Sequence, residues 1–492
     1  MTDKDDRRQR SILRRIARRA MIGRGLLPDF SPRVLAELGK IRGPAPQTDP
    51  PSRDLRNLAW CSIDNDDSRD LDQLTFAETL SGGDVKVLVA IADVDAIVGK
   101  TSEIDAHAQH NTTSVYTAAE IFPMLPEKLS TDITSLNYES DRLAIVIEMV
   151  IAEDGTLKDS DIYEAMVRNR AKLAYNSVAA WLDGKGAMPQ GITPVDGLEE
   201  NLRLQDGVAR RLKTLRCING ALNFETIEAR PKFVGDELRE MESDRSNRAK
   251  DIIENFMVSA NGITARYLSS RKIPSIRRVV RTPKRWERIV ELAAERNFKL
   301  PAEPDSKSLE KFLEAEKASE PVRFPDLSLS VIKLLGPGEY VVEIPGESSA
   351  GHFGLAVKDY NHSTAPNRRY PDIVTHRLLK AAMAGRSTPY GNDELGTLAK
   401  HCTEQENAVK KVERQVVKSA AAMLLESRIG DKFDAVVTGA ADKGTWVRIM
   451  NPPVEGRLVS GYEGADVGLR LRVQLLHTDV ERGFIDFKRE KG

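Results

Sequence analysis

The sequence predicts an α+β fold followed by a small β-barrel of the OB type. Two observations support this prediction. Between about residues 54 and 425, runs with the composition of strands are mixed with long helical patterns, and after residue 429 only short strands follow. Strands and helices mixed in one segment, and strands alone in the next, are typical of an α+β domain joined to a small all-β domain.

The central segment contains two runs of buried-strand character, Val85–Ala92 and Leu143–Val150, both rich in β-branched and other apolar residues. Residues 246–270 and 397–426 predict two long helices, since apolar side chains recur there at helical spacing. The central segment therefore supplies both kinds of element.

The C-terminal segment predicts five short strands separated by turns with Gly or Asp. These strands are Lys432–Thr438, Gly444–Ile449, Gly456–Val459, Leu471–Leu476 and Gly483–Phe487. Five short strands in so short a segment suit an OB-type barrel, which commonly binds nucleic acid. A small barrel without a nucleic-acid function remains the alternative.

Composition bounds the class of protein. The chain has 492 residues and a net charge of −1, from 73 basic and 74 acidic residues, so its total charge does not indicate a nucleic-acid partner. It has no apolar run long enough for a membrane span and no apolar signal segment, so we expect no membrane association. Its three cysteines form no CxxC pair, which indicates reduced thiols and a cytoplasmic protein.

We divide the chain into a basic N-terminal segment with a proline-rich linker (1–53), a central domain (54–428) and the barrel (429–492). In the first segment, Ile12, Leu13 and Ile16 fall at helical spacing among arginines. This pattern suits either a solvated helix or frayed tail, or a basic arm that guides RNA. The linker runs from Pro44 to Pro51.

The acidic run from Asp64 to Asp72 is the strongest candidate site. It lies between two short apolar stretches, so we expect a loop between strands that brings Asp64, Asp70 and Asp72 together. Hard divalent cations such as Mg²⁺ or Mn²⁺ prefer such oxygen ligands and serve phosphoryl chemistry. A calcium loop of the EF-hand type fits poorly, because Arg69 and Thr75 occupy its most demanding positions. A solvated acidic turn is the other alternative.

A second segment, His362 to Asp372, contains two adjacent arginines, Arg368 and Arg369, before a helix start predicted at Pro371. Guanidinium groups bind phosphate oxygens in a fork, and a helix N-terminus adds backbone donors. Taken alone, paired arginines are more often surface charge.

Several segments, taken in order, resemble the ribonuclease II/R family, whose catalytic module is the RNB domain. The resemblance covers about residues 54–425, and the C-terminal barrel is similar to the RNA-binding OB domain of that family. The matching segments are Ser62 to Asp64 with Arg69 to Asp72, Val89 to Val94, Thr113 to Tyr116, Ile121 to Ser130, and His362 to Asp372 with His376 and Arg377.

This resemblance implies a metal-dependent 3′-to-5′ exoribonuclease that releases nucleoside 5′-monophosphates from single-stranded RNA. It implies that the three aspartates bind Mg²⁺, with Mn²⁺ as the alternative ion, and that Arg368 contacts the scissile phosphate. The further residues that it implies for substrate binding are Arg369, Tyr116 and Phe224 as base-stacking aromatics, Tyr175 with Glu254 at the last nucleotide, and Glu413 in the substrate channel. Core packing is the alternative for the three aromatics, and a solvated helix position for Glu413. For Glu254, an apolar helix face predicts burial and hence a functional partner.

The sequence also departs from the family pattern. Gln73 stands where the family has a fourth aspartate, Asp95 stands near a usual histidine, and the cold-shock barrels that normally precede the catalytic module are expected to be missing, which makes this a short form. Gln73 motivates a second hypothesis, a catalytically silent RNA-binding protein. Basic residues between Ile276 and Arg285 suit either the RNA channel or a solvated face. With no coiled-coil pattern, we expect a monomer.

Overall fold

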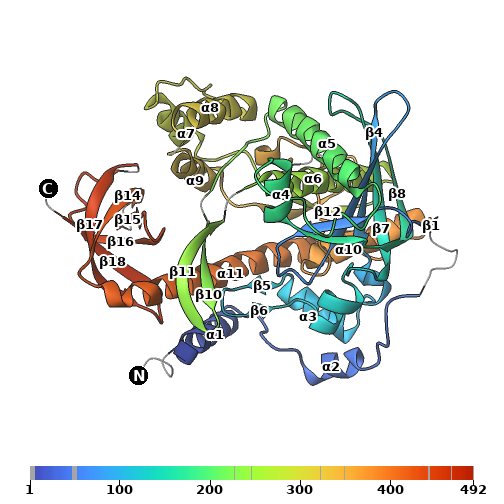
Figure 1. Cartoon of the computed structure of the whole chain (residues 1–492), viewed down its shortest axis with the longest axis horizontal. Helices are drawn as coiled ribbons and strands as arrows, with labels where there is room; N and C mark the ends of the chain where they lie inside the picture. The colour runs from blue at the N-terminus through green and yellow to red at the C-terminus, as the bar shows by residue number, and fades with distance from the viewer. Residues whose placement is uncertain are drawn as a thin grey trace.

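The computed structural model describes residues 6–46, 53–226, 228–244, 246–321, 323–347, 350–441, 444–466 and 468–490. A large sheet with its covering helices lies at one end of the molecule and a β-barrel at the other, and the long helix α11 (Asn392–Leu425) runs from one to the other (Figure 1). The α+β fold with a C-terminal barrel is therefore confirmed. Part of the proline-rich linker, residues 47–52, lies outside the described residues.

The large sheet has seven strands in the order β1-β8-β7-β4-β3-β2-β9. Its strands are β1 (Arg53–Asp54), β2 (Cys61–Asp64), β3 (Gln73–Thr79), β4 (Val85–Ala92), β7 (Asp141–Ile151), β8 (Leu157–Arg168) and β9 (Ala171–Ala174). Both predicted strands are confirmed at its centre, as β4 and β7, where apolar side chains are buried on both faces. Since β2 and β3 are antiparallel neighbours, the acidic run between them forms the loop that joins the end of β2 to the start of β3.

Helices cover the sheet and form the main hydrophobic core with it. The helices besides α11 are α1 (Asp6–Ile22), α2 (Pro32–Leu38), α3 (Glu103–Asn111), α4 (Tyr175–Leu182), α5 (Leu198–Ile218), α6 (Arg248–Ser270), α7 (Trp286–Ala294), α8 (Ser306–Ser319), α9 (Phe324–Leu335) and α10 (Tyr370–Met383). The two predicted long helices are α6 and α11, although α11 begins before residue 397. Within the described residues, no helix is both long enough and apolar enough to cross a bilayer.

Among the described residues, two-stranded antiparallel sheets complete the central domain: β5 (Val115–Tyr116) with β6 (Ile121–Phe122), β10 (Glu228–Val234) with β11 (Glu237–Asp244), and β12 (Ser275–Val279) with β13 (Glu339–Glu343). The C-terminal strands close into a barrel of β14 (Lys432–Ala441), β15 (Gly444–Ile449), β16 (Glu455–Ser460), β18 (Phe484–Arg489) and β17 (Arg470–Asp479). All five predicted strands are present.

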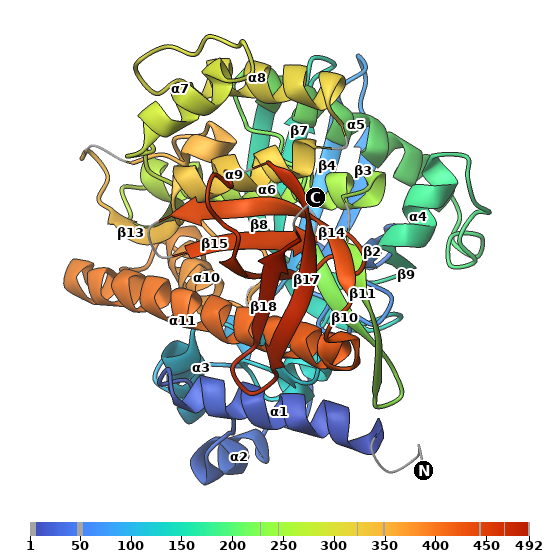
Figure 2. The same ribbon diagram turned by 90° about the vertical axis from the view of Figure 1, so that its left-hand side faces the viewer.

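The basic helix α1 of the N-terminal segment is docked on the rest of the protein and is neither frayed nor fully solvated. The apolar face of α1 is buried at Leu13, Ile16 and Met21, and α1 packs against α11 and β11. Figure 2 shows α1 lying alongside α11, below the barrel. Burial of this apolar stripe holds the arginines of α1 in fixed positions on the surface.

Candidate active site

Asp72 is the buried carboxylate at the end of the acidic loop. Its side chain is only 1% exposed and accepts hydrogen bonds from the backbone N–H of Asn367 at 2.9 Å and from Nε of Arg368 at 3.0 Å. Burial raises the pKa of Asp72 to about 7, while the charge of Arg368 opposes this rise. The contact joins the acidic loop to the segment before α10, and so brings the two candidate motifs together.

Asp64 and Asp70 lie near this carboxylate. Asp64 is the last residue of β2, and burial raises its pKa. The negative charge of Asp70 raises the pKa of both Asp64 and Asp72, and the positive charge of Arg368 lowers both. The three aspartates and Arg368 are therefore within electrostatic reach of one another, as a shared site requires.

The carboxylates are held by protein donors. Asp64 accepts the backbone N–H of Asn65 at 2.7 Å, and Asp70 accepts the Tyr116 hydroxyl at 2.6 Å. In the described part of the chain, no three Asp, Glu, His or Cys side chains are gathered as a complete set of metal ligands. The donor set nevertheless suits Mg²⁺ or Mn²⁺, because neighbouring carboxylates supply the negatively charged oxygen ligands that a hard divalent cation prefers. Binding would draw their oxygens together.

The loop is a connection between two strands of a sheet, whereas an EF-hand calcium loop joins two helices. The calcium-loop alternative is thereby excluded. Burial of Asp72 likewise excludes a fully solvated acidic turn.

Arg368 and Arg369 differ in their surroundings. The predicted helix start is confirmed, since α10 begins at Tyr370 with Pro371 in its first turn. Arg368 retains 44% of its side-chain exposure beside the acidic loop. Arg369 donates from Nη2 to Oδ1 of the buried Asp372 at 2.7 Å, so its guanidinium is engaged within the first turn of α10. Its predicted phosphate contact stays a prediction.

Tyr116 connects the acidic loop to α11. Its side chain is 38% exposed, and its backbone N–H donates to Oε1 of Glu413 at 2.9 Å. Glu413 is therefore not simply a solvated helix position, since it fixes the hairpin that carries Tyr116. The exposed ring of Tyr116 leaves it free to stack on a base.

Tyr175 also lies near the acidic loop. It is the first residue of α4 and follows Ala174, which pairs with Asp64 in the parallel register of β9 and β2. Burial raises the pKa of Tyr175, and the charge of Asp64 adds to this rise. Two of the three predicted aromatics thus lie beside the aspartates.

The structure does not bring Phe224 and Glu254 to the acidic loop through any hydrogen bond or ion pair between described residues. Phe224 packs against the hydrophobic cluster of α7, α8 and α9, as the core-packing alternative expects. The burial predicted for Glu254 is wrong: its side chain is 58% exposed and pairs with Arg216 at 3.4 Å. The apolar neighbours of Glu254 in sequence lie on other faces of α6. The substrate contacts predicted for Phe224 and Glu254 stay predictions.

Of the basic residues after Ile276, Arg277 and Arg278 are neither solvated nor free for RNA. Arg281, Lys284 and Arg285 are exposed, so both alternatives stay open for these three. Arg277 and Arg278 are 1% and 9% exposed. Arg277 pairs with Glu343, and Arg278 with Glu406 on α11 at 2.6 Å. Both guanidinium groups are therefore structural.

Asp95, which stands where the family pattern differs, belongs to a buried charge network. It accepts from Nε of Arg377 at 2.6 Å, and Arg377 also pairs with Asp105 at 2.8 Å. Lys380 contacts both Asp93 and Asp95, at 3.0 and 3.3 Å. This network ties α10 to the segment after β4 and so positions the helix whose start carries Arg368.

Sequence reasoning missed the residues that hold the acidic loop. The Ser135 hydroxyl accepts from the backbone N–H of Leu71 and donates to the carbonyl of Arg69, and Lys172 donates to the carbonyl of Ser68. Asn367 lies inside the arginine segment, where its position beside Arg368 was the only available signal. Ser135 and Lys172 carry no motif, because their contacts depend on tertiary packing.

Comparison with known families gives the same assignment. The RNB domain matches residues 52–385, and the RNase II-type exonuclease C-terminal S1 domain matches residues 431–490. The chain belongs to the ribonuclease II/R family. Its RNB domain contains the acidic loop and the α10 start, and its S1 domain is the C-terminal barrel.

Curated relatives are named Ribonuclease R. That of Vibrio parahaemolyticus is 32% identical over 422 residues, which cover 82% of this chain and 49% of the relative. That of Aquifex aeolicus is 32% identical over 469 residues, which cover 89% of this chain and 64% of the relative. The chain thus spans about half to two thirds of the length of these relatives.

Solved structures share the fold. Mycoplasma genitalium RNase R in complex with ribose methylated single-stranded RNA has a TM-score of 0.86 at 23% identity, covering 96% of this chain and 77% of that one. Yeast Ssd1, a pseudonuclease, has a TM-score of 0.68 at 15% identity, covering 85% of this chain and 51% of that one. Because the RNB fold occurs in both, the fold alone does not determine activity.

Proposed function

We propose that this chain is a metal-dependent 3′-to-5′ exoribonuclease that hydrolyses single-stranded RNA processively to nucleoside 5′-monophosphates. The contact between Arg368 and Asp72 is the observation that carries this proposal. Nε of Arg368 is committed to Asp72, and among the described residues no hydrogen bond occupies its two terminal nitrogens. These nitrogens lie beside the acidic loop, where a phosphate oxygen is needed.

Arg368 and the three aspartates have different roles in the proposed hydrolysis. Arg368 binds a non-bridging oxygen of the last phosphodiester and stabilises the charge that develops there, while Asp72 fixes the orientation of the guanidinium. A divalent cation held by Asp64, Asp70 and Asp72, magnesium or alternatively manganese, would supply an activated water and neutralise the leaving oxygen.

Tyr116 and Phe224 stack the terminal bases, and Tyr175 with Glu254 holds the last nucleotide. Stacking and phosphate contacts carry little base information, so we expect weak sequence preference. The proposed partner is single-stranded RNA, bound by a monomer. All three cysteines are free thiols, which supports a cytoplasmic location.

The proposal is tested with the purified chain and a 3′-labelled single-stranded RNA in Mg²⁺ or Mn²⁺. We expect labelled nucleoside 5′-monophosphate to be released from the first cycle, and release to stop in EDTA and in Asp72→Asn. The matched control is Asp326→Asn, which changes a carboxylate paired with Arg448 far from the acidic loop. Internal cleavage, or release that persists in Asp72→Asn, contradicts the proposal.

A catalytically silent RNA-binding protein is the second candidate, and Gln73 favours it. Gln73 is 6% exposed at the start of β3 and supplies a neutral amide where the family has a carboxylate. Tight binding of the same RNA without mononucleotide release in either metal would establish this second candidate. The geometry of Arg368 beside the three aspartates favours the enzyme.

A further inference from the structure

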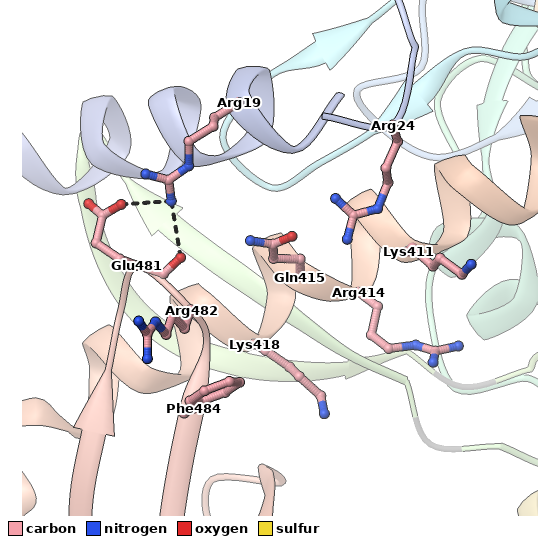
Figure 3. A pocket seen from close by; sticks show the side chains of 9 residues that line it. All are labelled: Arg19, Arg24, Lys411, Arg414, Gln415, Lys418, Glu481, Arg482 and Phe484. Carbon is pink, nitrogen blue, oxygen red and sulfur yellow. Dashed lines mark hydrogen bonds and ion pairs between the residues drawn. The ribbon is translucent and has the colours of Figure 1, made fainter. Parts of the chain in front are cut away.

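A basic pocket of about 470 Å³ lies between α1, α11 and the turn that joins β17 to β18 (Figure 3). Three distant parts of the chain form it, and six cationic side chains line it. These are Arg19, Arg24, Lys411, Arg414, Lys418 and Arg482. Glu481 is the single acidic residue in its lining. The pocket belongs to none of the residues assigned above to catalysis or substrate binding.

The positive charge of the pocket is largely unneutralised. Glu481 is already paired with Arg15 and Arg19. Lys418 and Arg482 have carboxylates only at 4.0 and 3.8 Å, beyond hydrogen-bond distance. Among the described residues, neither Lys411 nor Arg414 has an acidic partner within 4.0 Å. A concave surface with this balance attracts anions.

The pocket is held open by contacts of the fold. Arg19 bridges the carboxylate and the backbone carbonyl of Glu481, as the dashed lines in Figure 3 show. Gly483 has a φ of +67°, and a Cβ there would lie 2.8 Å from Cβ of Lys418 and 3.0 Å from the backbone N of Ser419. The turn therefore sits directly on α11, and a larger residue would separate them. Arg19 and the backbone that carries the other cations are therefore in place before any ligand binds.

Phe484 adds an exposed aromatic ring to the basic pocket. It opens β18 at the wall of the pocket, and 53% of its surface is exposed. An exposed phenyl ring among arginines and lysines suits a ligand with both anionic and flat aromatic groups. A nucleotide has both, since phosphates bind cations and bases stack on aromatic rings. An acidic peptide would use the cations but not the ring.

The pocket and the acidic centre both involve residues of α11. Arg414 follows Glu413 directly on α11, and Glu413 accepts the backbone N–H of Tyr116, whose hydroxyl contacts Asp70. Lys418 lies about 7.5 Å from Glu413 along the helix axis, at the usual rise of an α-helix. Arg414 and Lys418 share one face of α11, next to the face that carries Glu413, so an extended strand bound at the acidic loop has only a short distance to cover to the pocket.

We propose that this pocket is a nucleotide-binding site, outside the acidic centre, that holds a phosphate and a base of the RNA strand. It rests on the proposed function only in taking RNA as the ligand. The same chemistry would also bind a released nucleoside 5′-monophosphate. Competition by uridine 5′-monophosphate distinguishes the RNA strand from the released mononucleotide as the ligand. If the pocket binds the mononucleotide, uridine 5′-monophosphate should bind saturably to the unaltered chain and not to the pocket variants.

The test measures binding of a fluorescent 20-nucleotide single-stranded RNA to the full chain in EDTA, over a range of salt concentrations. The variants are Lys411→Ala/Arg414→Ala and Phe484→Ala. The control is Lys299→Ala/Lys400→Ala, which removes the same charge from exposed positions outside the pocket. Melting temperatures verify that each variant folds.

We expect the Lys411/Arg414 variant to flatten the slope of log K against log salt by about 1.4, from two lost phosphate contacts at about 0.7 each, and to weaken binding roughly ten- to thirtyfold at 0.1 M salt. Phe484→Ala should leave the slope unchanged and weaken binding by roughly five- to a hundredfold, from the loss of one stacked base. The control should do neither.

Binding by both pocket variants that equals the control overturns the proposal. A second result also overturns it: poly-glutamate of equal charge displaces the RNA as effectively as unlabelled RNA does, and Phe484→Ala does not change RNA binding. Neither result depends on hydrolysis. A chain that degrades RNA without using the pocket contradicts this inference alone, and one that uses the pocket but releases no mononucleotide contradicts the proposed function alone.

Discussion

The phenol of Tyr116 donates a hydrogen bond of 2.6 Å to Oδ2 of Asp70, so the β5–β6 hairpin holds a carboxylate of the acidic loop. Through its backbone N–H, the same tyrosine is bound to Glu413 of α11. A single residue thus connects the aspartates to the helix that leads to the S1 domain. Side chains that orient ligands in this way commonly set metal affinity.

Tyr116→Phe should raise the Mg²⁺ concentration for half-maximal hydrolysis by roughly tenfold, because Asp70 loses the donor that orients it. The ring remains, so RNA affinity in EDTA should be unchanged. Mononucleotide release is measured against Mg²⁺ concentration, with Tyr138→Phe as the control, since Tyr138 is 55% exposed. An unchanged Mg²⁺ dependence would show that the hydrogen bond does not orient Asp70.

Arg368→Lys should lower kcat by roughly 10²- to 10³-fold, the range for losing one donor to developing charge. Lysine keeps the positive charge but cannot bind Asp72 and a phosphate oxygen with one planar group. Single-turnover hydrolysis measures the loss. Arg386→Lys, at an exposed position after α10, should hydrolyse RNA at the unaltered rate. A fall of less than threefold in Arg368→Lys would contradict the role assigned to the guanidinium.

Gln73→Asp should lower the half-saturating Mg²⁺ concentration several-fold, since a fourth carboxylate adds charge to the site. In EDTA the same variant should lose about 1–3 kcal/mol of unfolding free energy, because Gln73 is buried and an unpaired carboxylate there is costly. Hydrolysis against Mg²⁺ and urea unfolding measure the two effects. Gln73→Asn is the neutral control. Equal stability of Gln73→Asp with and without Mg²⁺ would place this position outside the metal site.

Arg377→Met should lower the free energy of unfolding by about 3–5 kcal/mol, because it leaves the buried Asp105 without its arginine and Asp95 with Lys380 alone. Arg377 is only 4% exposed. Urea unfolding gives the difference. Arg203→Met removes an exposed pair with Glu199 on α5 and should cost less than about 1 kcal/mol. Equal losses in the two variants would argue against the network as a support of α10.

Two buried histidines should each contribute a loss of folding stability as the pH falls from about 6.5 to about 4. Burial lowers the pKa of His107 and of His352 to about 4, so below pH 6.5 the unfolded chain binds protons that the folded chain does not. The stability that these two histidines contribute is therefore full above pH 6.5 and falls as the pH drops toward 4, whereas the raised pKa of Asp72 acts in the opposite direction. His107→Gln should reduce this fall by roughly 1–3 kcal/mol in urea unfolding at pH 4.5 relative to pH 7.5. His477→Gln, at an exposed position, should leave it unchanged.

Much of this protein could be predicted from local sequence. The apolar run Val85–Ala92 is β4 with the same bounds, Pro371 lies in the first turn of α10, and the five strands of the barrel are all present. The acidic loop was also predictable, because a run of carboxylates between two apolar strands forms the connection between the ends of those strands. In each case the pattern records which side chains face a core, and that periodicity is local.

The tertiary structure decided the partners of the charged residues. Asp72 meets Arg368 across 296 positions of sequence, whereas Arg277 and Arg278 are buried against Glu343 and Glu406. Glu254, on a helix with apolar neighbours, is exposed. No local pattern determines these outcomes, because the partner of a charged side chain depends on which distant element packs beside it. The sequence by itself determined the elements and the acids; the packing of α1, α10 and α11 decided which cations neutralise those acids and which remain available at a basic pocket.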